Sequence, residues 1–162
     1  MKKINFLTQA AMIAALYVVL TLAINAFGLA SGAIQVRVSE ALTILPYFTP
    51  AAIPGLFIGC LLSNTITGCA LFDIIFGSIA TLLGAVGTYL LRRHKWLAPV
   101  SPIIANTIIV PFVLSYVYGT PGTIPYLMLT VGIGEVLSCG VLGMVLLFAL
   151  NKYKTTLFGA QN

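Results

Sequence analysis

Long apolar runs alternate with short polar breaks along the chain. Residues 4–36 carry no charge, and further apolar runs fill 73–91, 99–118 and 126–151. A helix rises about 1.5 Å per residue, so roughly 20 apolar residues cross the hydrocarbon core of a bilayer. The pattern predicts long helices at Ile4–Phe27, Asp73–Leu91, Pro99–Tyr118 and Tyr126–Asn151.

The stretch Glu40–Leu62 is also apolar, but prolines interrupt it at positions 46, 50 and 54. Proline removes a backbone donor and restricts the residue before it, so the chain can reverse here. We therefore expect two short helices, Ala41–Phe48 and Ala51–Ser63. Because lipid satisfies no backbone group, such short pieces must pack against protein. The expected fold is an all-α, six-helix transmembrane bundle in one domain, residues 1–162.

Composition excludes a lone soluble globule. Of the 162 residues, 60% are apolar and 7% are charged, with a mean hydropathy of +1.09. Average soluble domains carry about 25% charged residues. A water-facing hydrolase, a nucleic-acid reader and a disulfide scaffold are therefore disfavoured.

The net charge of +5 comes from clusters at the flanks of the apolar runs. Basic residues open the chain, fill 92–95 and follow the last run at 152–154. This arrangement is typical of cytoplasmic loops of membrane proteins. It predicts a multi-pass protein of the cell membrane with both termini in the cytoplasm, provided that the Glu40–Leu62 stretch enters and returns. A five-span alternative would place Arg92 outside. With six helices, the loops Gly28–Ser39, Asn64–Leu71 and Tyr118–Pro125 face outward.

The three acids of the chain, Glu40, Asp73 and Glu135, then all lie toward the outer half. A carboxylate within a membrane costs several kcal/mol unless it faces a cavity or a partner. We expect all three to contact a ligand, with Arg37 on the outer loop. The structural alternatives are an ion pair of Glu135 or Glu40 with Arg37, and helix capping by Glu40 or Asp73.

Two amides are further candidates for binding the ligand. Asn64 could instead cap a helix, and Asn106 could instead hydrogen-bond to a neighbouring helix. Phe72 or Tyr116 could supply an aromatic floor for a flat ligand. The three cysteines lack zinc-ligand spacing and the chain has one histidine, so we expect no metal and no cofactor.

Nucleotide-binding and hydrolase motifs are absent from the sequence. It has no G-x-x-x-x-G-K-[ST], no G-x-S-x-G and no H-E-x-x-H. The chain is therefore not expected to be an enzyme. Alanines at positions 10, 11, 14 and 15 form two overlapping A-x-x-x-A spacings, which pack a protein's own helices or dock a partner in the membrane.

The run IQVRVSEALTILPYFTP (Ile34–Pro50), the alanine motif and the six short apolar helices together resemble a known family. They are similar to the QueT-type substrate-binding (S) components of energy-coupling factor (ECF) transporters. Asn64 with the downstream Gly68 and Asp73 adds to the resemblance, which covers essentially the whole chain.

The resemblance implies a binding subunit for queuosine precursors, which are 7-deazaguanines, or for queuine. It implies partners on separate chains: a membrane T subunit and two ATPase subunits. It also implies that Ala10, Ala11, Ala14 and Ala15 meet the T subunit. The expected ligand contacts are Arg37, Glu40, Asn64, Phe72, Asp73, Asn106 and Glu135.

Apart from the resemblance, the hydrogen-bonding groups of a deazaguanine match these candidate side chains. A deazaguanine edge presents two neighbouring N–H donors, which one carboxylate accepts as a pair. Its carbonyl and ring nitrogen suit donors such as Arg37 or an asparagine. Alternatives remain: an S component for another vitamin, a stand-alone proton-coupled carrier, or a structural membrane subunit.

Overall fold

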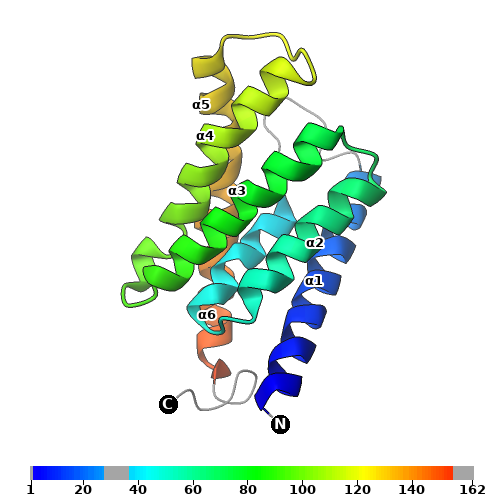
Figure 1. Ribbon diagram of the computed structural model, residues 1–162. Helices are drawn as coiled ribbons and strands as arrows, with labels where there is room; N and C mark the ends of the chain where they lie inside the picture. The colour runs from blue at the N-terminus through cyan, green and yellow to red at the C-terminus, as the bar shows by residue number, and fades with distance from the viewer. Residues whose placement is uncertain (1, 28–36, 155–162) are drawn as a thin grey trace.

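Four helices are long and apolar enough to cross a membrane: Ile4–Ala26, Leu71–Leu90, Lys95–Tyr116 and Ile124–Asn151. In this computed structural model, which describes residues 2–27 and 37–154, they belong to α1 (Lys2–Ala26), α3 (Leu71–Leu90), η2 (Lys95–Leu97) with α4 (Val100–Tyr116), and a last continuous helix (Figure 1). The expected all-α membrane bundle is confirmed. The expected loop at residues 28–36 lies outside the described residues.

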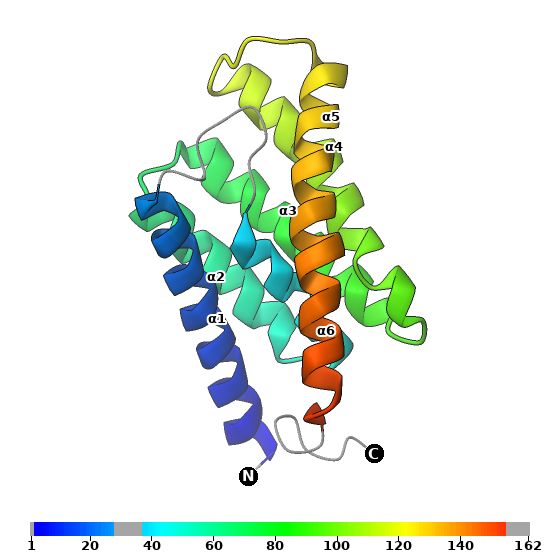
Figure 2. The same ribbon diagram turned by 180° about the vertical axis from the view of Figure 1, so that it is seen from behind.

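A short helix occupies the middle of the bundle. This helix, η1 (Val38–Tyr47), is a 3-10 helix rather than the expected α-helix at Ala41–Phe48, and it begins three residues earlier. It contacts α1, α2 (Ala52–Ile66), α3 and α6, and Figure 2 shows it between α1 and the last helix. Residues 39–46 are all buried. The expectation that this segment needs protein around it is therefore confirmed.

Small residues bring α1 and α2 into close contact. A Cβ added to Gly55 would lie 2.7 Å from the carbonyl oxygen of Ala10. A Cβ added to Gly59 would lie 2.8 Å from Cβ of Tyr17 and 3.1 Å from Cα of Ala14. Any side chain at either glycine would force the two helices apart. This seam fixes the position of Tyr17, which points from α1 into the core.

The last helix contains a change of helix type. It consists of α5 (Ile124–Glu135), the π-helix η3 (Val136–Leu142) and α6 (Gly143–Asn151). The expected helix Tyr126–Asn151 is confirmed, with a start two residues earlier, but the π segment was not predicted. Short π segments occur mostly inside α-helices and frequently at functional sites. Here the segment begins directly after Glu135.

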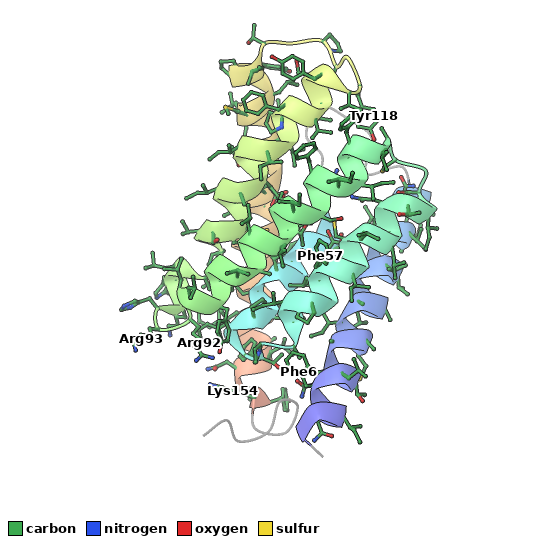
Figure 3. The ribbon with its side chains drawn as sticks, viewed as in Figure 1. Phe6, Phe57, Arg92, Arg93, Tyr118 and Lys154 are labelled. Atoms are coloured by element: carbon green, nitrogen blue, oxygen red, sulfur yellow. The ribbon has the colours of Figure 1, made fainter. Side chains whose placement is uncertain are left out.

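The two ends of the bundle differ. The start of α1, the end of α6 and the connection between α3 and α4 lie at one end (Figures 1 and 2). The connections α2–α3 and α4–α5 lie at the other end. Figure 3 shows the same separation, with Arg92, Arg93 and Lys154 at the first end and Tyr118 at the second. We call these the basic end and the cavity end.

Candidate functional site

A cavity of about 350 Å³ opens at the cavity end, between α1, the start of η1, α2, α3 and the end of α4. A volume in this range suits a small organic ligand. Its lining is rich in groups that donate or accept hydrogen bonds: Tyr17, Thr21, Asn25, Arg37, Ser39, Asn64, Thr67, Asp73, Tyr118 and Thr120. One cation and one carboxylate stand among these neutral groups.

Asn64 is held at the cavity wall by the turn that ends α2. Gly68 adopts a φ of 73°, a conformation that favours glycine, and the N–H of Cys69 then donates to the carbonyl of Asn64 over 3.0 Å. Asn64 lies within α2, which ends at Ile66, so its side chain does not cap the helix. Within residues 2–27 and 37–154, its amide nitrogen donates to Cys60 Sγ alone, at 3.6 Å. Although Asn64 is 5% exposed, its side-chain oxygen has no hydrogen-bond partner among the described residues.

Asp73 lies in the first turn of α3 and makes no side-chain capping bond there. Instead its Oδ2 accepts a 2.9 Å hydrogen bond from the hydroxyl of Tyr118, which in turn accepts one from the N–H of Ala70 at 3.1 Å. Burial, and then the hydrogen bond to Asp73 and its negative charge, raise the pKa of Tyr118 to about 12. The phenol therefore stays protonated and keeps donating at neutral pH.

Arg37 precedes η1 in an extended conformation, with φ −96° and ψ 92°. Burial alone would lower the pKa of Arg37. Asp73 and the other acidic groups around it have the larger combined effect and raise the pKa above its usual value, so the guanidinium stays charged. Within the described part of the chain, no ion pair joins Arg37 to Asp73, although both line the cavity. The two opposite charges are therefore both available to a ligand.

Glu40 lies beneath the cavity and is 1% exposed. Its Oε1 accepts hydrogen bonds from the hydroxyl of Tyr17 and from Thr81 Oγ1, the latter at 3.3 Å. Its Oε2 accepts one from Asn106 Nδ2 at 3.3 Å. Three neutral donors thus hold this carboxylate in place of the alternative ion pair with Arg37.

Glu135 joins the same cluster from the last helix. Its Oε2 accepts a hydrogen bond from Cys139 Sγ at 3.2 Å, and the same thiol lies 3.4 Å from the carbonyl oxygen of Glu40. Ligand atoms of Glu40, Glu135 and Cys139 lie within 4.8 Å of one another, so these are the described side chains that could hold a metal ion. We call Glu40, Thr81, Asn106, Glu135 and Cys139 the inner cluster.

The predicted site residues therefore fall into two groups. Arg37, Asn64 and Asp73 come together on the cavity wall, while Glu40, Asn106 and Glu135 lie in the inner cluster. Tyr17 was not predicted as a site residue; it lines the cavity and donates a hydrogen bond to Glu40, and so joins the two groups. The available signal was its place on the face of Ala10 and Ala14, three residues after Ala14. Tyr118 was also not predicted; it lies at the boundary between a predicted helix and a predicted loop, where no pattern indicates the direction of a side chain.

Phe72 is placed away from the cavity. It is 58% exposed and stacks on Phe76, with ring centroids 6.4 Å apart. With Tyr116 it lines a separate apolar hollow on the outer surface of α3 and α4. The aromatic rings on the cavity wall are instead those of Tyr17 and Tyr118.

The alanine motif of α1 is divided between two faces. Ala10 and Ala14 are buried against α2, as the close approach to Gly55 and Gly59 requires. Ala11 and Ala15 are exposed on a neighbouring face of the helix. Only the second pair is therefore free to contact another protein.

Comparison with known proteins gives two findings. The family model described as "QueT transporter" matches residues 7–152. A curated relative, "Queuosine precursor transporter QueT" of Lactococcus lactis subsp. cremoris (strain MG1363), is 37% identical over 86 residues, which are 52% of this chain and 50% of the relative. The alignment thus spans half the length of that relative. No solved structure matches. Because the family model covers most of the sequence, including every element that builds the cavity, the chain belongs to the QueT transporter family.

Proposed function

We propose that this chain is the substrate-binding membrane subunit, or S component, of an ECF-type importer, and that it binds a 7-deazaguanine queuosine precursor or queuine from the extracellular side. One observation carries the proposal: Arg37 and Asp73 lie on the same cavity wall without pairing with each other. The function named for the Lactococcus relative supports the same ligand class.

The cavity chemistry matches the two edges of a deazaguanine. Asp73 offers Oδ1, which Tyr118 leaves free, and the second lone pair of Oδ2 to the paired N–H donors of the base. Arg37 donates to the ring carbonyl, and the free oxygen of Asn64 accepts a further donor. The rings of Tyr17 and Tyr118 supply stacking surfaces, each worth about 1–3 kcal/mol for a base. The unpaired groups would reject analogues that cannot bond to them.

The inner cluster has a supporting role in this proposal. Glu40 accepts the hydrogen bond of Tyr17 and is itself held by Asn106, so the cluster positions a residue of the cavity wall. Glu135 remains a candidate ligand contact, because it is buried without an ion pair among the described residues and its Oε2 accepts a hydrogen bond from the thiol of Cys139. If it contacts the ligand, Glu135→Gln weakens binding at least about tenfold, or 1.4 kcal/mol. Unchanged affinity would remove it from the site.

Transport requires partners in this proposal. A T subunit and two ATPase subunits would supply the energy, and the exposed Ala11 and Ala15 would meet the T subunit. Both termini would be cytoplasmic, because the basic end carries the positive residues. The cavity at the opposite end would then open outward. No bond of the ligand is made or broken.

Uptake into vesicles tests the partner requirement. Vesicles that hold this chain with the T subunit and ATPases, supplied with ATP, should accumulate labelled queuine, whereas vesicles with this chain alone should not. Uptake by the chain alone, driven by a pH gradient, would contradict the proposal and favour a proton-coupled carrier. Competition by riboflavin or thiamin at equal concentration would instead favour an S component for another vitamin.

A further inference from the structure

A group of basic and aromatic side chains lies at the basic end, far from the cavity. Lys95 and Trp96, in the connection between α3 and α4, both contact Phe148 of α6: Lys95 Nζ lies 5.5 Å from the centre of the Phe148 ring, and the two aromatic rings meet edge to face at 5.6 Å. Lys152, the C-cap of α6, follows Phe148 by four residues and so lies one turn beyond it, with its Nζ 5.9 Å from the centre of the Tyr153 ring. We call these four residues the basic-aromatic site.

No acidic side chain of the sequence pairs with the positive charge of this site. All three acids of the sequence, Glu40, Asp73 and Glu135, are buried and are 1%, 5% and 5% exposed. They belong to the cavity wall and the inner cluster. Arg92 and Arg93, also exposed, add to the positive charge near the site. The exposed lysines therefore leave positive charge that an anionic group can bind.

The surroundings of the site indicate what that group is. Trp96 is 67% exposed, as is typical of tryptophan at a membrane–water interface. Exposed apolar side chains are also present on the two helices that carry or follow the site, with Val145 of α6 at 63% and Ile104 of α4 at 53%. A molecule bound at this site thus contacts ammonium groups and an aromatic ring at one end, and exposed apolar side chains along the rest of its length.

We infer that Lys95, Trp96, Phe148 and Lys152 form a binding site for the headgroup of an anionic phospholipid. The lysine ammonium groups bind the phosphate, and the acyl chains lie along the exposed apolar residues of α4 and α6. Basic residues near a membrane surface attract anionic lipids in this way. The site is separate from the cavity, so an experiment that refutes lipid binding here does not refute the proposed function, and the reverse also holds.

The chain carries its own probe, because Trp96 is the only tryptophan in the sequence. The full-length protein is reconstituted in bilayers of equal amounts of phosphatidylglycerol and phosphatidylcholine. In one preparation the phosphatidylglycerol carries brominated acyl chains, and in the other the phosphatidylcholine does. Bromine quenches tryptophan on contact, so the ratio of the two quenching values reports which lipid lies beside Trp96. We expect brominated phosphatidylglycerol to quench at least about twofold more.

Charge-removing variants distinguish a site from a general surface effect. Lys95→Gln/Lys152→Gln should bring the quenching ratio close to one, whereas Lys2→Gln/Lys3→Gln removes the same charge from the start of α1 and should leave the ratio high. An unchanged helical circular dichroism spectrum shows that each variant is folded. Equal quenching by the two lipids in the unmodified protein would overturn the inference and leave the basic end to an acidic protein partner. An equal loss in both double variants would also overturn it, because no local site would then exist.

Discussion

The hydroxyl of Tyr118 donates a 2.9 Å hydrogen bond to Oδ2 of Asp73, and so joins the end of α4 to the first turn of α3 across the cavity. This bond orients the carboxylate and leaves its second oxygen for a ligand. Its donor, Tyr118, lies at the boundary between the predicted helix Pro99–Tyr118 and the predicted loop Tyr118–Pro125. The arrangement makes Asp73 the side chain whose contribution to binding can be measured most cleanly.

Replacing Asp73 by asparagine should weaken ligand binding at least about tenfold, which corresponds to 1.4 kcal/mol. Asparagine keeps the size of the side chain but presents a donor where the base presents donors. Calorimetric titration of queuine into the detergent-purified chain measures the change. Tyr118→Phe is the matched control: it keeps the carboxylate and should weaken binding less than Asp73→Asn. Equal affinities for Asp73→Asn and the unmodified protein would remove Asp73 from the site.

Ionisation of Tyr118 should occur at unusually high pH. Its pKa is about 12 in the folded protein, because burial and Asp73 disfavour the phenolate. An unfolded tyrosine ionises near pH 10. The contribution of Tyr118 to the free energy of unfolding is therefore complete below about pH 10 and is lost as the pH rises toward 12. The difference between ultraviolet pH titrations of the unmodified protein and Tyr118→Phe isolates this group. A difference titration centred at pH 10 or below would contradict this environment of Tyr118, partly buried and bonded to Asp73.

Gly77 should keep space for the side chains of Asn64 and Asp73, because it has no Cβ. A Cβ at this position would lie 3.2 Å from Asn64 Nδ2 and 3.4 Å from Asp73 Oδ1, and so would press on two of the proposed ligand contacts. Gly77→Ala should therefore weaken queuine binding several-fold without lowering the midpoint of thermal unfolding, since alanine favours a helix by about 1 kcal/mol over glycine.

Gly140→Ala is the control for Gly77→Ala. Its added Cβ would meet Val136 Cγ1 at 3.7 Å, which is an ordinary contact, and Gly140 does not line the cavity. Its affinity for queuine should match that of the unmodified protein. If both alanine variants bind with unchanged affinity, the space at Gly77 is not needed for the ligand.

Glu40 should matter for stability as the acceptor of three donors. In Glu40→Gln, one acceptor oxygen becomes an NH₂ group that faces the hydroxyl or amide donors of Tyr17, Thr81 and Asn106. A buried donor left unsatisfied costs about 1–3 kcal/mol, so the midpoint of thermal unfolding in detergent should fall. In a cycle with Tyr17→Phe, the two losses should not add, because the residues share one hydrogen bond. Additive losses would contradict the direct contact.

The helical bundle was predictable from sequence because the features that specify its helices are local in the sequence. Long apolar runs flanked by lysine and arginine specify spanning helices, and the prolines at 46 and 50 specify a break. The 3-10 form of η1 and the π segment after Glu135 were not predictable, since both depend on how η1 packs against the last helix.

The site was predictable only in part. A charged or amide side chain in an apolar run must find a polar partner, which identified Arg37, Asn64 and Asp73 as candidates. Which partner each one finds depends on tertiary contacts. For that reason Glu40 could not be assigned to Tyr17, Thr81 and Asn106, and Phe72 could not be assigned to the outer surface. Ala10 and Ala14 likewise pack on glycines of α2 that lie about 45 residues away in sequence.

Equilibrium binding to the purified chain, without ATP or partner subunits, tests the central claim most directly. Queuine titrated into the detergent-solubilised protein should bind with one site per chain, and a base with the exocyclic amine removed should bind at least about tenfold more weakly. Absence of binding by queuine and by the 7-aminomethyl and 7-cyano precursors, in protein that shows a cooperative thermal transition, would contradict the assignment of the Arg37–Asp73 cavity to this ligand class.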